Sequence, residues 1–264
     1  MLVPEPEIDA LGLAGMREAV LPSGVRLLSG KIPPGQHDAV WRRLLDHHPA
    51  TGWYPVLGQD VESAAVRAAQ FPADVQGPEA LVAARAADPV ERMRILHQSA
   101  LEETTEECDE EEASEWYAAY DPATVVARFD AVSPPARGVH RETDGHPPTQ
   151  VLLVEAAQGY EVPVLVPGLI HPNWYGGPSY PSLIPEDHLA VLRLWHERHG
   201  AELYYAGGTS LELSVARPPT TKAEVARCAV EQSVYCHDLL GIFGKPADVA
   251  VKQVSNHHWS FWWD

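Results

Sequence analysis

Apolar residues recur at two spacings along the first hundred residues. Residues 25–30 predict a short strand that ends in a Pro-Pro-Gly break. Between residues 37 and 48 the apolar positions recur every three or four residues, as on one face of a helix. Residues 51–57 predict a turn followed by a strand, and prolines divide residues 60–100 into short helical pieces. The amino-terminal part is therefore predicted to be a strand-helix-strand unit with a helical cover.

The last 115 residues have a different pattern. Residues 151–154 and 162–166 are apolar runs on either side of a Gln-Gly-Tyr turn, and they predict a hairpin. Pro185 opens a predicted helix that ends at Gly200, since proline favours the first helical position and glycine the position after the last one.

Two further hairpin strands and two helices complete this half. Residues 203–205 and 211–215 flank Gly207-Gly208 and predict a second hairpin. Thr221 and Glu224 have the spacing of a capping box, which predicts a helix to about residue 237. A short helix over residues 247–254 leads to a terminal aromatic strand.

Together these elements predict an α+β protein, with a mixed or antiparallel sheet covered by helices on one face and a helical amino-terminal extension. We expect residues 1–132 to form the amino-terminal part and residues 133–149, rich in proline and glycine, to form a linker. Residues 150–264 are predicted to be the carboxy-terminal α+β domain. The amino-terminal half is either a separate domain or a cover for the same sheet, and we favour one sheet with helical additions.

Charge is unevenly distributed along the chain. The formal net charge is −18, and residues 102–115 hold nine acids and no base. Such a run is expected to stay solvated. Nucleic acid and anionic membranes are poor ligands for this chain, because both bind through lysine and arginine. A basic protein partner is the expected complement.

Several features favour a cytoplasmic protein. The amino terminus has acids where a signal peptide has basic charge, and no apolar segment approaches the roughly 20 residues of a membrane helix. Three cysteines at irregular spacing match neither a disulfide framework nor a zinc ribbon. No nucleotide-binding or common hydrolase motif occurs, so we expect no cofactor.

A few residues carry the chemistry of a possible site. Cys236 and Asp238, with His171 brought near by folding, have the residue types of a nucleophile, an orienting acid and a base. Side chains one or two positions apart on a helix diverge, which favours a structural Cys236. His196 and His199 are candidate metal ligands at three-residue spacing, and they have no H-E-x-x-H pattern around them.

Aromatic residues give the candidate binding positions. The loop over residues 171–181 combines aromatic and small residues, as recognition loops do. The terminal strand carries aromatic residues on both faces, and we expect one face to be core and the other to be covered by another element or a partner. The candidate binding residues are Trp174, Tyr175, Tyr180, Trp195, Arg217, Trp259, Trp262, Trp263 and Asp264.

The carboxy-terminal half resembles the domain of unknown function 4253 family, which is bacterial. The resemblance rests on Trp195, Gly200-Ala201-Glu202, Leu211-Glu212-Leu213, Arg217-Pro218-Pro219, Ala229, Glu231-Gln232, Cys236, Asp238, Trp259 and Phe261-Trp262-Trp263-Asp264. The helix around Trp41 and residues 51–55 are similar to the amino-terminal part of longer members, many of them actinobacterial. The family implies a bacterial cytoplasmic setting and provides no catalytic residue.

The sequence therefore favours a non-enzymatic protein-binding factor of a regulatory or immunity type, whose acidic run or aromatic end engages its partner. Two alternatives stay open at this point. One is an enzyme with a site around Cys236, Asp238 and His171, and the other is a protein that binds metal through its histidines.

Overall fold

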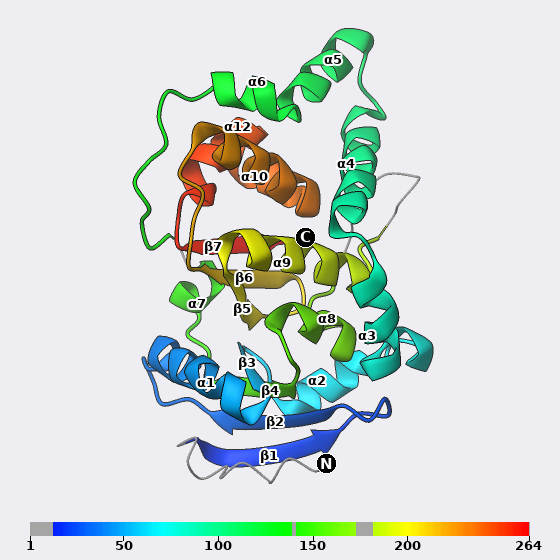
Figure 1. The fold of residues 1–264 in the computed structure, drawn as a ribbon, viewed down its shortest axis with the longest axis vertical. Helices are drawn as coiled ribbons and strands as arrows, with labels where there is room; N and C mark the ends of the chain where they lie inside the picture. Colours follow the sequence, from blue (N-terminus) through cyan, green and yellow to red (C-terminus); the bar gives the residue numbers. More distant parts are fainter. Residues whose placement is uncertain (1–12, 139–140, 173–181, 264) are drawn as a thin grey trace.

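A single mixed sheet organises the molecule. The computed structural model describes residues 13–138, 141–172 and 182–263, and these form a seven-stranded sheet with the order β1-β2-β4-β3-β5-β6-β7 (Figure 1). Only the β3–β5 pair among them is parallel. The predicted α+β class is confirmed. The strands are β1 (Ala14–Val20), β2 (Arg26–Lys31), β3 (Trp53–Leu57), β4 (Gln150–Glu155), β5 (Ala201–Ala206), β6 (Ser210–Val215) and β7 (His258–Trp262).

Strand β4 lies between two strands of the amino-terminal part. Its Leu152 is opposite Ser29 of β2 on one side and Val56 of β3 on the other. The four residues from Val151 to Val154 are completely buried. Strands from before and after residues 133–149 thus belong to the same sheet. The sequence predicts that segment to be a linker, and it contains the short helix α7 (Arg141–Gly145).

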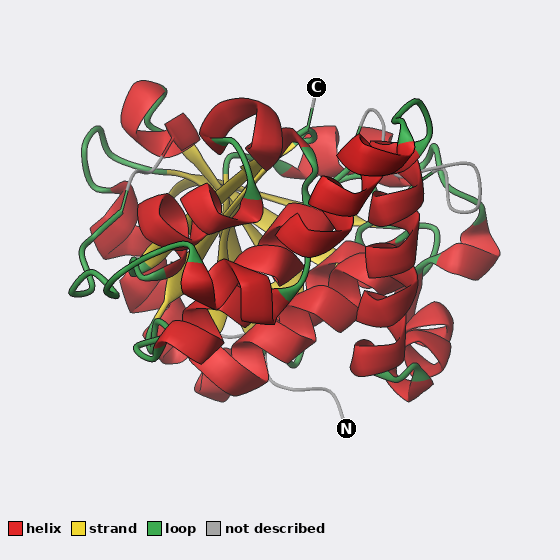
Figure 2. Cartoon of the chain, turned by 90° about the horizontal axis from the view of Figure 1, so that it is seen from above, coloured by secondary structure: helices red, strands yellow, loops and turns green. Residues whose placement is uncertain are grey.

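Helices cover the sheet, and in the view from above they lie around the strands (Figure 2). None in the described ranges has the length and apolar character needed to cross a membrane. The helices are α1 (His37–Thr51), α2 (Val61–Ala68), α3 (Gly77–Ala86), α4 (Pro89–Thr105), α5 (Glu110–Ala119), α6 (Pro122–Ala127), α8 (Val162–Leu165), α9 (Pro185–His199), α10 (Lys222–Tyr235), α11 (Asp238–Phe243) and α12 (Pro246–Val249). A π-helical turn over Ala250–Val254 follows α12.

The two faces of the sheet have separate cores. The larger core joins side chains from β2, β3 and β4 to helices α2, α3, α4, α8, α9 and α10. On the other face α1 packs Val40, Trp41 and Leu44 against β3 and β4. The indole of Trp41 donates to the carbonyl oxygen of Pro55 at 3.1 Å, which fixes α1 to β3.

Several predicted elements are confirmed with their end signals. Helix α9 begins at Pro185 and ends at His199, and Gly200 directly after it adopts a left-handed conformation with φ of 60°. Helix α10 begins after Thr221, whose hydroxyl accepts from the N–H of Glu224 at 3.3 Å. The hairpin of β5 and β6 and the terminal strand β7 are also present.

The predicted strand over residues 162–166 is wrong. Residues 162–165 form helix α8, which follows a 3₁₀ turn over Gly159–Glu161 and has Pro163 in its first turn. Proline suits that position because its missing N–H would have no helical partner there. The carboxylate of Glu161 is buried and accepts from Arg85 Nε at 2.8 Å and from the N–H of Ala157 at 3.1 Å, so it holds the turn. Strand β1, at the edge of the sheet, has no counterpart among the predicted elements.

Side chains alternate between the two faces of the sheet along β7, so substitutions at two neighbouring residues should lower the stability by different amounts. Phe261 is completely buried and stacks on Trp195 at a centroid distance of 5.3 Å, whereas Trp262 faces the other side and is half-buried. Phe261→Ala should lower the free energy of unfolding by about 3–5 kcal/mol, and Trp262→Ala by clearly less. Urea unfolding of both variants measures this, and equal losses would contradict the assigned faces.

Candidate functional site

The acidic run lies on ordered helices. Its first acids are on the last turns of α4, and those from residue 110 onward are on α5. Asp109 caps α5 by accepting from the N–H of Glu112 at 2.9 Å. Three glutamates occupy the first turn, where the positive end of the helix dipole stabilises negative charge. We call residues 102–119 the acidic arm.

Helix α5 of the acidic arm is only partly packed against the rest of the molecule, through Trp116 on its inner side. None of the residues of α5 is buried, and Tyr117 is 56% exposed. Figure 1 shows α5 and α6 at the end of the molecule farthest from β1. Helices in proteins gain most of their stability from a buried face. Since no residue of α5 is fully buried, part of its surface is accessible for further packing.

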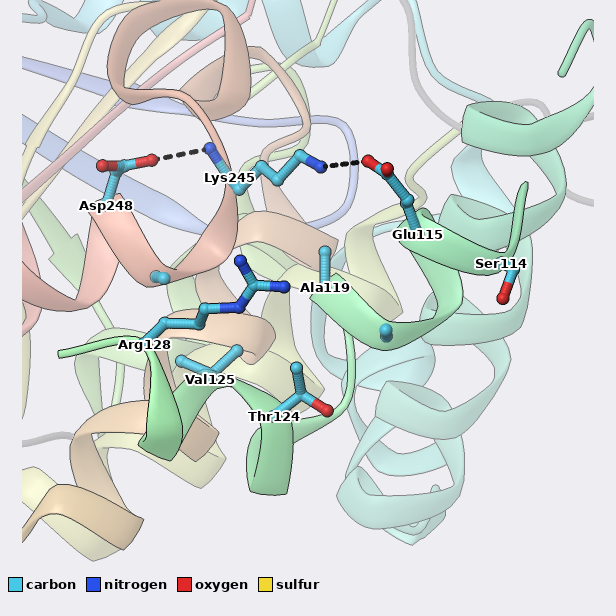
Figure 3. A pocket seen from close by; sticks show the side chains of 10 residues that line it. Ser114, Glu115, Ala119, Thr124, Val125, Arg128, Lys245 and Asp248 are labelled. Atoms are coloured by element: carbon cyan, nitrogen blue, oxygen red, sulfur yellow. Dashed lines mark hydrogen bonds and ion pairs between the residues drawn. The ribbon is translucent and has the colours of Figure 1, made fainter. Parts of the chain in front are cut away.

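A hollow of about 520 Å³ opens between α5, α6 and α12, and we call it the arm hollow (Figure 3). Small apolar side chains form part of its wall, and Arg128 points into it. The guanidinium of Arg128 has no hydrogen-bond or ion-pair partner within the described ranges. The lining residues are Ser114, Glu115, Ala118, Ala119, Thr124, Val125, Arg128, Lys245, Ala247 and Asp248.

Lys245 bridges the hollow. Its side-chain Nζ is 3.1 Å from Glu115 Oε2 and 5.2 Å from the ring centroid of Trp116. Its main-chain N–H donates to the carboxylate of Asp248 at 3.0 Å. Both side chains of the Lys245–Glu115 pair are largely exposed, and such pairs contribute about 0–1 kcal/mol. A partner with basic side chains can therefore replace this contact at little cost.

The residues predicted for a nucleophilic site lie in different surroundings. Cys236 is completely buried, its thiol donates to the carbonyl oxygen of Trp262 at 3.1 Å, and burial raises its pKa. Asp238 begins α11, and the ring of His171 packs edge-on against Phe71. A buried thiol with a raised pKa is a poor nucleophile at neutral pH.

The candidate metal ligands also diverge. His196 Nδ1 is 3.1 Å from Glu202 Oε1, and His199 packs against the ring of Trp259 at a centroid distance of 5.6 Å. The carboxylate of Glu202, which accepts from the ring of His196, raises the pKa of His196, whereas burial lowers that of His199. Within the described ranges no three His, Cys, Asp or Glu side chains are grouped to hold a metal ion.

The candidate binding aromatics divide by accessibility. Trp195, Trp259 and Trp263 are buried in one cluster with Tyr235 and Phe261, so no partner can reach them in this conformation. Trp262 is half-buried on the other face, and Arg217 is exposed. The remaining candidates, Trp174, Tyr175, Tyr180 and Asp264, lie outside the described residues.

Sequence reasoning missed a buried polar contact on the second face of the sheet. Glu212 of β6 is completely buried and accepts from Thr143 Oγ1 and from the N–H of Glu142, both at 2.8 Å. His258 Nε2 of β7 lies 3.4 Å from the same carboxylate. Burial acts to raise the pKa of Glu212, but these three neighbours outweigh it and the pKa lies below its usual value. Glu212 thereby anchors α7 to the sheet.

Comparison with known proteins identifies the carboxy-terminal part. Its residues match the family model described as Domain of unknown function (DUF4253), over positions 150–264. Residues 150–264 are similar to DUF4253 domains. The resemblance seen in the sequence is thereby confirmed. No curated protein and no solved structure matches the chain.

The DUF4253 segment includes β4, so the match begins at the strand that lies between β2 and β3. It also includes Cys236, Glu212 and His258. The acidic arm precedes it in the chain, and the arm hollow takes Lys245, Ala247 and Asp248 from the DUF4253 segment. The hollow is thus shared between that segment and the residues before it.

Burial of Cys236 predicts its reactivity. In the folded protein at pH 7.5, a thiol reagent such as iodoacetamide should leave Cys236 unmodified, whereas the partly exposed Cys108 reacts slowly. All three cysteines should react in denaturant. Peptide mass spectrometry measures each position, and rapid labelling of Cys236 in the native protein would contradict this account.

The lowered pKa of Glu212 predicts a pH-dependent stability. A carboxylate of this kind contributes stability above its unfolded pKa of about 4.5, and the contribution disappears as the pH falls through the folded pKa. Glu212→Gln should lower the free energy of unfolding by about 1–3 kcal/mol at pH 7. The difference from wild type should shrink below pH 4.5.

Urea unfolding between pH 7 and pH 3.5 measures this difference. Glu155→Gln, at an exposed position at the end of β4, is the matched control and should change stability by less than about 0.5 kcal/mol. A Glu212→Gln effect that is the same at both ends of the pH range would show that the charge of Glu212 is not what stabilises α7.

Proposed function

We propose that this chain is a non-enzymatic binding protein of a regulatory or immunity type, acting in the bacterial cytoplasm, and that it engages a basic protein through the acidic arm. The observation that carries the proposal is that α5 has no buried residue and yet holds the densest run of acids in the chain. A helix in this state has both an uncovered surface and a strong charge. A basic partner would complement both.

The distribution of charge supports this choice of partner. The nine acids of residues 102–115 equal half of the net charge of −18, and no lysine or arginine interrupts them. Clustered charge of this kind raises the association rate with a partner of opposite sign. The exposed Tyr117 and the apolar wall of the arm hollow add the packing surface that charge alone does not provide.

The surroundings of Cys236 favour this proposal over an enzyme built on that residue. Its thiol is buried and donates a hydrogen bond to a main-chain carbonyl oxygen, as a structural cysteine does. The three cysteines are all free, which agrees with a reducing compartment.

A charge-neutralised arm tests the proposal. The triple variant Glu110→Gln, Glu111→Gln, Glu112→Gln should lose a basic partner that the wild-type protein retains from a lysate of the source organism at low salt. The matched control is Glu79→Gln, Asp130→Asn, Glu155→Gln, which changes the net charge equally at exposed positions outside the arm. The control variant should retain the partner, and high salt should release it from wild type.

Quantitative mass spectrometry of the three captured samples provides the readout. A basic protein recovered in stoichiometric amount with wild type and control, and reduced at least fivefold with the arm variant, supports the proposal. Equal recovery of every protein with all three baits would show that the arm does not bind a partner.

A further inference from the structure

Arginines cluster around a second hollow, far along the chain from the acidic arm. It has a volume of about 400 Å³ and lies where α9 ends and the turn after β6 leads into α10. The lining holds three arginines and one histidine against two glutamates, in a chain with 37 Asp and Glu and 19 Lys and Arg. We call it the arginine pocket; its lining residues are Arg198, His199, Arg217, Pro218, Pro219, Thr220, Glu224, Arg227 and Glu231.

Two of the three guanidinium groups are held in place by the fold. Arg198 Nη1 is 2.6 Å from Glu231 Oε1, and Arg217 Nη2 donates to the carbonyl oxygen of Glu197 at 3.5 Å. Arg217 also lies over Gly200, where a Cβ would come within 2.9 Å of its Nη1. The glycine that ends α9 thus leaves the space that the Arg217 guanidinium occupies.

Both glutamates of the pocket are already engaged. One oxygen of Glu231 pairs with Arg198, and the other accepts from the indole of Trp195 at 3.1 Å. Glu224 accepts from the hydroxyl of Thr221 at 2.8 Å and from its N–H at 3.2 Å, in the capping box of α10. These bonds lower the pKa of Glu224 and keep it ionised. Both acids thus hold neighbouring groups of the pocket in place, and most N–H donors of the three arginines have no partner among the described residues.

Arg227 is the clearest of these unused groups. Its side chain is exposed on α10 beside the pocket, and within the described ranges it has neither a hydrogen-bond nor an ion-pair partner. An arginine has five N–H donors in a planar fork that matches the oxygens of a phosphate or carboxylate group. Arg217, Pro218, Pro219 and Glu231 are also among the residues on which the family resemblance rests.

We propose that the arginine pocket binds a small molecule through an oxyanionic group, a phosphate or a carboxylate, held between Arg198, Arg217 and Arg227. The volume of about 400 Å³ suits a small metabolite and is too small for a folded partner. Pro218 and Pro219 form a rigid wall beside the arginines. This site is separate from the acidic arm, and neither proposal depends on the other.

Titration calorimetry of the full chain with inorganic phosphate, citrate and, at equal ionic strength, sodium chloride tests the site. Phosphate or citrate should bind with one site per chain, and chloride should not. Saturation with phosphate alone assigns phosphate groups as ligands, and saturation with citrate alone assigns polycarboxylates. Absence of binding by both oxyanions at millimolar concentration would overturn the proposal.

Variants separate this pocket from general surface charge. Arg217→Gln and Arg227→Gln should each weaken binding about tenfold or more, because each removes charge-assisted hydrogen bonds. Arg42→Gln removes the same charge from an exposed position on α1 and should leave the affinity unchanged. Arg227 is exposed, so its variant should fold normally, as circular dichroism can verify. Equal affinity in the Arg227→Gln variant and in wild type would also overturn the proposal.

Discussion

The pairing of β4 with β2 and β3 is the constraint on which the rest of the structure depends. This strand comes from the DUF4253 segment, yet both of its neighbours belong to the residues before it. Its residues Val151 to Val154 contribute to both cores, because alternate side chains point to opposite faces of the sheet. Helix α1 packs on one of these cores, and helices α3, α4 and α9 pack on the other.

The two proposed binding sites lie outside the cores of this sheet. The aromatic cluster around Trp195 and Phe261 fills the larger core under α9 and α10, and it leaves little of the carboxy-terminal strand accessible. Helix α5 of the acidic arm, in contrast, has no fully buried residue and packs against the larger core only through the half-buried Trp116. The arginine pocket has the opposite charge and lies at the end of α9. The chain thus presents a negative surface and a positive recess, built on separate elements.

Local signals in the sequence predicted local structure well. Pro185 with Gly200 and Thr221 with Glu224 are end signals contained in short segments, and the helices that they mark are present. The apolar run over residues 162–166 was ambiguous, because a short buried helix and a buried strand have the same composition. The turn that makes it helical depends on Arg85, which is 76 residues from Glu161.

The candidate site shows the same limit. The charge of the acidic arm is visible in the sequence, and its helical order follows from Asp109 as a cap. The contact of Glu212 with Thr143 and His258 joins three segments, and the only local sign of it is an acid among the alternating apolar residues of β6. The three arginines of the pocket come from different elements, so no single segment of the sequence shows the cluster. The one local sign is Arg217 directly before Pro218 and Pro219.

Equilibrium unfolding of residues 150–264 produced alone, beside the full chain, tests most directly whether β4 makes the two parts one folding unit. The full chain should unfold in a single transition that coincides by tryptophan fluorescence and circular dichroism. The isolated segment should show no cooperative transition, because β4 would lose both neighbours and expose its apolar residues. A segment that unfolds cooperatively with the midpoint of the full chain would contradict this account.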